Sequence, residues 1–179
     1  MKTLLLSALL LTANPGALCA ESPGFVDFSK IAELAGGSTV DVHLKGPLLS
    51  MAARIVDKGE AEVAELLRSL KLVRVNVFKV DEANRAEIQK RILALRAELI
   101  AQKWEQLVSV RDKKDDVGVY IKTRGEEAIE GVVVSVMDGK GEAVLVNIVG
   151  DLKPDQIGML ADKFNIDPLK KVQKHSKKN

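Results

Sequence analysis

The second half of the chain contains four short β-rich runs that follow one another closely, and valine or isoleucine recurs at every second position in each. The runs are WEQLVSVRD (104–112), VGVYIKT (117–123), GVVVSVMD (131–138) and EAVLVNIVG (142–150). A period of two residues is typical of β-strands, and links as short as these join neighbouring strands in antiparallel order. This half of the chain therefore predicts an antiparallel sheet, with a tight hairpin turn at DGKG, residues 138–141.

The first half mixes helical and strand patterns. Two further strands are expected at 39–45 and 71–80, where valine or leucine recurs at every second position. Apolar spacings of three and four residues predict helices at 25–34, 48–56, 60–70, 82–103 and in the segment that follows Pro154. The predicted fold class is α+β: an antiparallel or mixed sheet of about six strands with helices packed on one face.

The first 20 residues resemble a secretory signal peptide. A basic start at Lys2 precedes an apolar run from Leu4 to Leu11, and small residues follow the helix-breaking stretch at 14–16. Lipid attachment at Cys19 is the less favoured alternative, because Leu18 stands where a lipoprotein needs a small residue. We therefore expect residues 1–20 to be a cleaved signal peptide, residues 21–169 to be a single domain, and the protein to be periplasmic.

Charge is distributed unevenly along the chain. Residues 21–169 carry a formal charge of −4, because 21 Lys and Arg stand against 25 Asp and Glu. The tail 170–179 is basic and is expected to be disordered. Weak contact of this tail with an anionic membrane is an alternative role for its lysines, Lys170, Lys171, Lys174, Lys177 and Lys178. Nucleic-acid binding is not expected, because the body is acidic and aromatic residues make up only 3% of the chain.

The sequence offers few of the residues that enzymes and metal sites use. There are two histidines, His43 and His175, and one cysteine, so no metal site built from these residues is expected. No serine-hydrolase elbow, P-loop or dinucleotide motif occurs. The acidic run DKKDD, residues 112–116, is interpreted as a solvated hairpin loop. No cofactor and no catalytic residue are predicted.

Strand alternation does suggest one candidate binding surface. If the valines of the strands face the helices, the reverse face of the sheet displays a mixed set of polar and aromatic side chains. Such a face is either simply solvated or a surface for a partner or ligand, since aromatic rings beside hydrogen-bonding groups are good anchors. The candidate binding residues are His43, Asn76, Phe78, Tyr120 and Asn147, with Lys122 beside them.

Several segments resemble one bacterial family. They are GFVDF, VDVHLKGPLL, WEQLVSVRD with VGVYIK, and above all AVLVNIVGDLKPDQIGML. Together they are similar, over about residues 24–165, to the exported family catalogued as the domain of unknown function four-two-five-two. The resemblance implies a periplasmic or envelope-attached protein of Gram-negative bacteria, without established catalytic residues. Asn147 and Asp151 fall in the matching block.

The function expected from these features is that of a non-enzymatic binding or interaction module of the cell envelope, whose partner is an unidentified envelope protein or ligand. An enzyme that uses scattered carboxylates or His43, in a pocket that the sequence does not reveal, is one alternative. Association with a membrane surface through the lysine-rich tail is the other.

Overall fold

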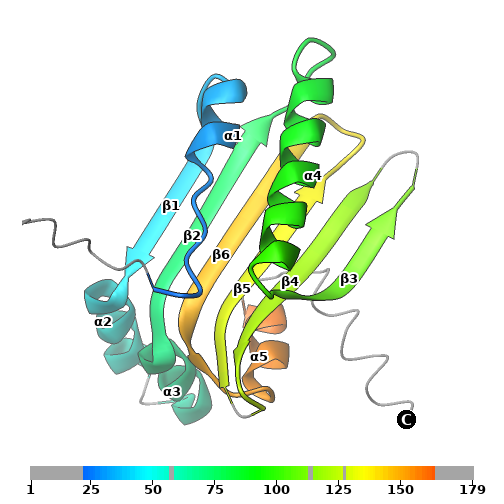
Figure 1. Cartoon of the computed structure of the whole chain (residues 1–179). Coiled ribbons are helices and arrows are strands. Elements are labelled where there is room, and N and C mark those ends of the chain that lie inside the picture. The colour runs from blue at the N-terminus through cyan, green and yellow to red at the C-terminus, as the bar shows by residue number, and fades with distance from the viewer. Residues whose placement is uncertain (1–21, 57–58, 113–114, 127, 164–179) are drawn as a thin grey trace, which may run out of the picture.

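The computed structural model of the protein describes residues 22–56, 59–112, 115–126 and 128–163 (Figure 1). Eleven elements follow one another in this part of the chain. The helices are α1 (Ser29–Leu34), α2 (Gly46–Val56), α3 (Ala61–Ser69), α4 (Arg85–Ala101) and α5 (Gln156–Lys163). The strands are β1 (Val40–Lys45), β2 (Leu70–Lys79), β3 (Glu105–Arg111), β4 (Asp116–Arg124), β5 (Ala128–Met137) and β6 (Glu142–Leu152).

The strands form one six-stranded sheet in the order β1-β2-β6-β5-β4-β3, and every neighbouring pair is antiparallel. Strands β3 to β6 follow one another through short links, as their sequence predicts, and β6 then pairs with β2 from the first half of the chain. The predicted α+β class with a six-stranded antiparallel sheet is confirmed.

The strand register divides the sheet into two chemically different faces. One row of paired residues crosses all six strands and consists only of valine: Val42, Val75, Val146, Val134, Val119 and Val108. The row beside it points to the opposite face and runs His43, Arg74, Asn147, Val133, Tyr120 and Gln106. We call these the valine face and the mixed face.

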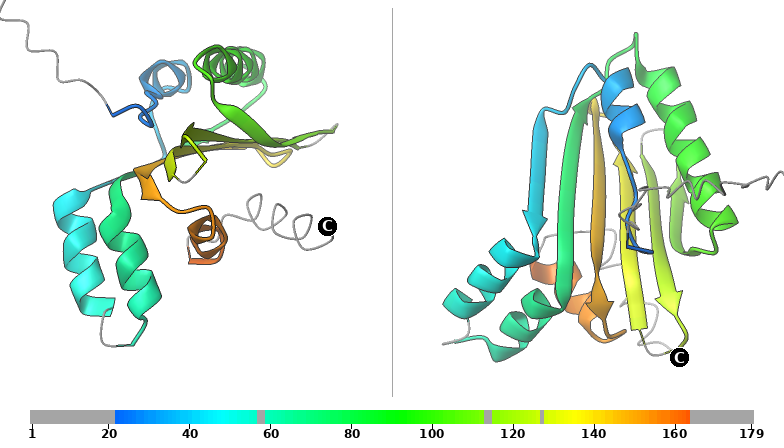
Figure 2. Two further views of the ribbon diagram at one scale, coloured as in Figure 1. Left: turned by 60° about the horizontal axis from the view of Figure 1, so that its bottom comes forward. Right: turned by 60° about the vertical axis from the view of Figure 1, so that its left-hand side comes forward.

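Helices pack on both faces and are not confined to one (Figure 2, left). Leu49 of α2, Leu66 of α3 and Ile157 of α5 join the core of the valine face. On the mixed face, α1 and α4 cover a second core that contains Phe78 and Tyr120. Two helical layers are needed because the mixed face carries apolar side chains that would otherwise remain in water.

The longest helix, α4, uses the apolar stripe that its sequence predicts. Ile88, Ile92, Leu95 and Leu99 lie three or four residues apart, and each is almost completely buried against the mixed face. The first helix is shorter than predicted. It begins at Ser29 and not at Phe25, because the Asp27 carboxylate accepts hydrogen bonds from the Ser29 amide at 3.0 Å and from the Ser29 hydroxyl at 2.5 Å.

The predicted turn at residues 138–141 is confirmed as the link between β5 and β6. The Asp138 carboxylate accepts hydrogen bonds from the backbone amides of Lys140 and Glu142, and the Asp138 amide bonds to the Glu142 carbonyl oxygen. Gly141 has a φ of 101°, a conformation that favours glycine.

Over the described ranges of the chain, no helix combines the length and the apolar character needed to cross a membrane. The predicted signal peptide and the lysine-rich tail lie outside the described residues.

Candidate binding site

Residues 22–28, here called the strap, begin with a turn in which the Phe25 amide donates to the Ser22 carbonyl oxygen at 2.7 Å, and then cross the mixed face ahead of α1 (dark blue in Figure 1). The Asn147 side chain on β6 holds the backbone of the strap. Its Oδ1 accepts a hydrogen bond from the Val26 amide at 2.9 Å, and its Nδ2 donates to the Gly24 carbonyl oxygen at 2.9 Å. Nδ2 also lies 3.3 Å from the Val132 carbonyl oxygen of β5. A completely buried side-chain amide thus gives the strap the hydrogen bonds that a neighbouring strand would provide.

Two glycines allow the strap to lie directly on the sheet. A Cβ added to Gly24 would stand 2.0 Å from the Glu130 carbonyl oxygen, and one added to Gly131 would stand 2.6 Å from both Gly24 Cα and the Trp104 ring. A side chain at either position would push the strap away from the sheet, because the closely packed backbone around the two glycines cannot move aside.

An open pocket lies where the strap meets the end of β1 and β2 that leads to the two helices α2 and α3. Its volume is about 390 Å³, within the range of small-molecule sites. Apolar side chains come from the strap (Phe25), β2 (Leu72) and β6 (Val149). The register sets Lys45, Leu72 and Val149 side by side across three strands on the mixed face. This end of the mixed face therefore has an apolar floor that is bordered by charge.

Three basic residues stand around that floor. His43 and Lys45 are two residues apart on β1 and hence on the same face of the strand. Lys71 lies in the register irregularity between Leu70 and Leu72, where a bulge changes the direction of a side chain. Ser22 completes the lining, and among the described lining residues there is no carboxylate. Such a site attracts an anionic group and offers apolar contact beside it.

Arg74, the cross-strand neighbour of His43, is already engaged. Its guanidinium lies 3.4 Å from the Asp27 carboxylate and 5.9 Å from the centre of the Phe28 ring. The hydrogen bond from the Ser29 hydroxyl holds the pKa of Asp27 below its ordinary value of 3.8. The Ser29 amide and Arg74 contribute in the same direction, while partial burial opposes them. Asp27 therefore pairs with Arg74 and not with either lysine of the pocket.

A second hollow lies between α1 and α4, with a volume of about 280 Å³. Its lining mixes acids and bases, including Asp27, Lys30, Arg91 and Glu98. Arg91 and Glu98 pair with each other at 2.9 Å. Because its charges are balanced and partly paired, this hollow selects a ligand charge less clearly than the pocket at His43.

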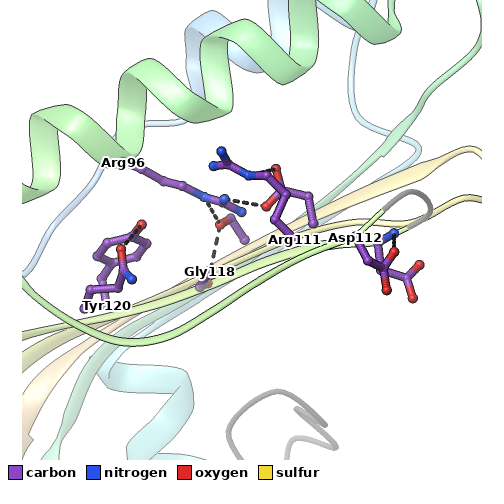
Figure 3. Close-up of polar contacts among 9 residues, drawn as sticks. Arg96, Arg111, Asp112, Gly118 and Tyr120 are labelled. Carbon is purple, nitrogen blue, oxygen red and sulfur yellow. Dashed lines mark hydrogen bonds and ion pairs between the residues drawn. The ribbon is translucent and has the colours of Figure 1, made fainter.

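A buried polar cluster joins α4 to β4 and β5 (Figure 3). Arg96 points down from α4, with Nη1 at 2.5 Å from the Asp116 carboxylate and Nε at 3.1 Å from the Ser135 hydroxyl. Arg96 and Asp116 are 6% and 4% exposed. Arg111, which is largely exposed, approaches the second Asp116 oxygen at 3.8 Å. Gly118 leaves the space for the guanidinium, since a Cβ there would lie 2.8 Å from Arg96 Nε. The cluster fixes the position of α4 on the sheet.

Tyr120 lies near this cluster and donates a hydrogen bond from its hydroxyl to Gln106 Oε1 at 3.1 Å (Figure 3). Burial raises the pKa of Tyr120 above its ordinary value of 10.0, and Asp116 acts in the same direction while Arg96 opposes it. The phenol therefore remains neutral at physiological pH and serves as a hydrogen-bond donor inside the core.

The five candidate binding residues do share one face, as their alternation predicts, but they do not form an exposed surface. His43, Asn147 and Tyr120 belong to one row of the register, and Asn76 and Phe78 point to the same side from β2. The expectation that this face is open to solvent is wrong for four of them: Asn76, Phe78, Tyr120 and Asn147 are each no more than 2% exposed. The strap, α1 and α4 cover them. Only His43 is exposed and lines a pocket.

Two further expectations need correction. Lys122 is half-buried, and its ammonium donates to the carbonyl oxygen of Gln102 at the end of α4. Asp116, at the end of the DKKDD run, does not belong to a solvated loop, because it begins β4 and pairs with Arg96. The sequence did contain a signal for this pair: Arg96 occurs inside the apolar stripe of α4, one residue after Leu95, where a lone charge needs a buried partner.

No group of three or more His, Cys, Asp or Glu side chains within the described part of the chain is arranged to hold a metal ion. The pocket is therefore characterised by its basic and apolar side chains.

The fold and the pocket together define an α+β domain with a doubly covered antiparallel sheet and one basic, partly apolar pocket at its corner. The chain belongs to the family described as Domain of unknown function (DUF4252), which matches residues 36–160. The match includes all six strands and the pocket residues of β1, β2 and β6, while the strap precedes it. Neither a curated protein nor a solved structure matches the chain significantly.

Proposed function

We propose that this chain is an exported protein of the bacterial cell envelope that works as a non-enzymatic binding module, and that its ligand combines an anionic group with an apolar one. The observation that carries the proposal is the pocket at His43. Three basic residues, His43, Lys45 and Lys71, surround a floor made by Leu72 and Val149. Neither lysine has an ion-pair partner among the described residues of one chain. Lys71 lies on β2, away from the free edges of the sheet, so its ammonium group is available to a ligand.

The chemistry of the lining supports binding more directly than catalysis. A general acid–base mechanism needs a titratable group that is oriented by a second one. The described residues around His43 supply positive charge and apolar surface, which recognise a carboxylate or phosphate attached to a hydrocarbon group. The shape of the site, an open corner with one wall made by the strap, suits a ligand that extends beyond the pocket.

The ligand class can be tested with sodium octanoate, used below its micelle concentration, on the uniformly ¹⁵N-labelled mature protein. Octanoate should shift the backbone signals of His43, Lys71, Leu72 and Val149. Octan-1-ol has the same chain without the charge and should bind at least about tenfold more weakly, because hydrogen bonds to charged groups contribute about 1.5–3 kcal/mol.

The matched pair of variants is Lys71→Glu and Lys79→Glu. Both residues are exposed on β2, but only Lys71 lines the pocket. Lys71→Glu should remove the octanoate response and Lys79→Glu should leave it unchanged. Equal binding of octanoate and octanol, or an octanoate response that survives Lys71→Glu, would contradict the proposed ligand class.

The compartment rests on the signal-peptide pattern of residues 1–20 and on the family resemblance. The intact mass of the protein recovered from its host tests it directly. A chain that begins at Glu21 in the soluble periplasmic fraction is the expected result. A diacylated chain that begins at Cys19 would place the pocket at a membrane surface, and an uncleaved chain in the cytoplasm would refute export.

A further inference from the structure

The free edge of β1 and the outer side of α2 lie along one side of the molecule (Figure 1; Figure 2, right). Among the described residues, β1 pairs only with β2, so its other edge presents backbone groups that no described strand contacts. Seven large apolar side chains are exposed in the described part of the chain, and four of them belong to these two elements: Val40, Leu48, Met51 and Ile55. Clustered exposure of this kind marks an interaction surface.

The exposed residues of α2 form a stripe. Leu48, Met51 and Ile55 are three and four residues apart, which places them on one side of the helix, and they are 52%, 59% and 78% exposed. Leu49 and Ala53 point the other way and are buried in the protein. A helix that already has a buried face gains nothing in the monomer from this second apolar stripe, so the stripe points to a partner.

We infer that the partner is a second copy of this chain, bound edge to edge so that the two β1 strands pair antiparallel about a two-fold axis at His43. In this register Asp41 of each copy stands opposite Lys45 of the other, and Val42 stands opposite Leu44. The two charged pairs are identical by symmetry, as an isologous interface requires. β1 is thus complementary to itself in charge, and two six-stranded sheets become one continuous sheet.

The same register brings the exposed apolar residues together. Val40 stands opposite Gly46 of the second copy, the residue at which α2 begins. Val40 and α2 both lie on the valine-face side, since Val40 alternates with Asp41 and Leu49 of α2 packs into the core of that face. The stripe of each copy therefore approaches the exposed end of β1 in the other, and the four residues are covered together.

The opposite edge of the sheet, β3, is less suited to pairing. Its register with β4 is interrupted between Gln106 and Val108, and such irregularities protect edge strands from association. The register of β1 with β2 runs without interruption over six residues. A single exposed large apolar side chain, Leu107, lies on β3.

Sedimentation equilibrium of the mature protein without any ligand tests the dimer, which makes the result independent of the ligand proposed above. The expected mass is that of two chains. Asp41→Lys and Lys45→Asp should each weaken association at least about tenfold, because each creates two like-charge contacts across the axis. The double variant Asp41→Lys/Lys45→Asp should restore it, since the two charges are exchanged and again face each other.

Ile55→Glu tests the helical stripe separately and should also yield monomers, whereas Leu107→Glu on the far edge should leave the dimer intact. The four substituted side chains are exposed, so each variant should fold. Circular dichroism is the check of folding for each variant. A wild-type chain that is monomeric at every concentration would overturn the inference. A dimer whose affinity does not change on the charge reversals at β1, and which Leu107→Glu dissociates, would overturn it as well.

Discussion

Asn147 holds the backbone of Val26 although 121 residues separate the two in the chain. The Asn147 side chain accepts from the Val26 amide and donates to the Gly24 carbonyl oxygen, so one buried amide satisfies two backbone groups that have no strand beside them. The wall of the pocket depends on this arrangement, because Phe25 lies between the two anchored residues.

Asn147→Ala should therefore release the strap and destabilise the protein. Leaving the Val26 amide and the Gly24 carbonyl without partners costs about 1–3 kcal/mol for each group that stays buried. Urea unfolding measures the loss, and hydrogen exchange should show much faster exchange of the Val26 amide. Asn76→Ala is the matched control: Asn76 is equally buried on the same face but donates to the Ser38 hydroxyl at 3.1 Å, away from the strap. Unchanged Val26 exchange in Asn147→Ala would contradict this role.

Because Arg96 and Asp116 form a buried ion pair, a single substitution should lower the unfolding free energy more than a double substitution that removes both charges. Asp116→Asn leaves the buried guanidinium without its counter-charge and should cost about 3–5 kcal/mol of unfolding free energy. Asp115→Asn, one residue away and exposed, should cost less than about 0.5 kcal/mol. The double variant Arg96→Met/Asp116→Asn should recover part of the lost unfolding free energy, because neither charge remains buried. Chemical denaturation measures this recovery. If the losses of unfolding free energy in Arg96→Met and in Asp116→Asn simply add up in the double variant, the two residues do not act as a pair.

Phe78 tests which side of the sheet is covered. It is completely buried beneath the helices of the mixed face, so Phe78→Ala should lower the unfolding free energy by about 3–5 kcal/mol. Leu48→Ala on the exposed stripe of α2 removes a comparable apolar side chain and should cost less than about 0.5 kcal/mol in the monomer. Urea unfolding at a protein concentration that keeps the chain monomeric makes the comparison. Similar costs for the two would mean that the mixed face is open.

Asp27 should titrate below its ordinary pKa of 3.8, which ¹³C NMR of its carboxyl carbon can follow. Ser29→Ala should raise this pKa more than Arg74→Gln does, because the Ser29 hydroxyl makes the largest contribution. The sign for stability follows from linkage: a lowered folded pKa favours the native state above the unfolded pKa, and the benefit is lost as pH falls through the folded pKa. A larger effect of Arg74→Gln would reverse the proposed order of causes.

The strands were predictable because period-two alternation is a local pattern. The strand predicted at 39–45 contains the whole of β1, and the four runs from Trp104 onward became β3 to β6. Alternation also places His43, Asn147 and Tyr120 on one face correctly. It does not say which face a helix covers, because the stripe of α4 is equally compatible with either side. The candidate surface was therefore assigned to solvent, while its aromatic residues are core.

The strap and the partner of Arg96 could not be predicted from the sequence for a different reason. The strap has no period of its own, and its partner is a side-chain amide from the other end of the domain. Asp116 stands in an acidic run whose composition favours a loop, and only the fold shows that the strand begins there. Both depend on tertiary contacts between distant residues. The pocket arises in the same way, from four segments that meet only in the folded chain.

The anchored strap also makes Ser22 a useful position for a reporter group. Ser22 lines the pocket, and the strap is fixed to the sheet through Gly24 and Val26. A residue can move no more than about 3.3–3.6 Å for each residue that separates it from a fixed point. A fluorophore attached to Ser22 would therefore stay at the opening of the pocket and respond to its occupant. A bulky purification tag would obstruct the same opening, so ligand screens should use a chain tagged elsewhere.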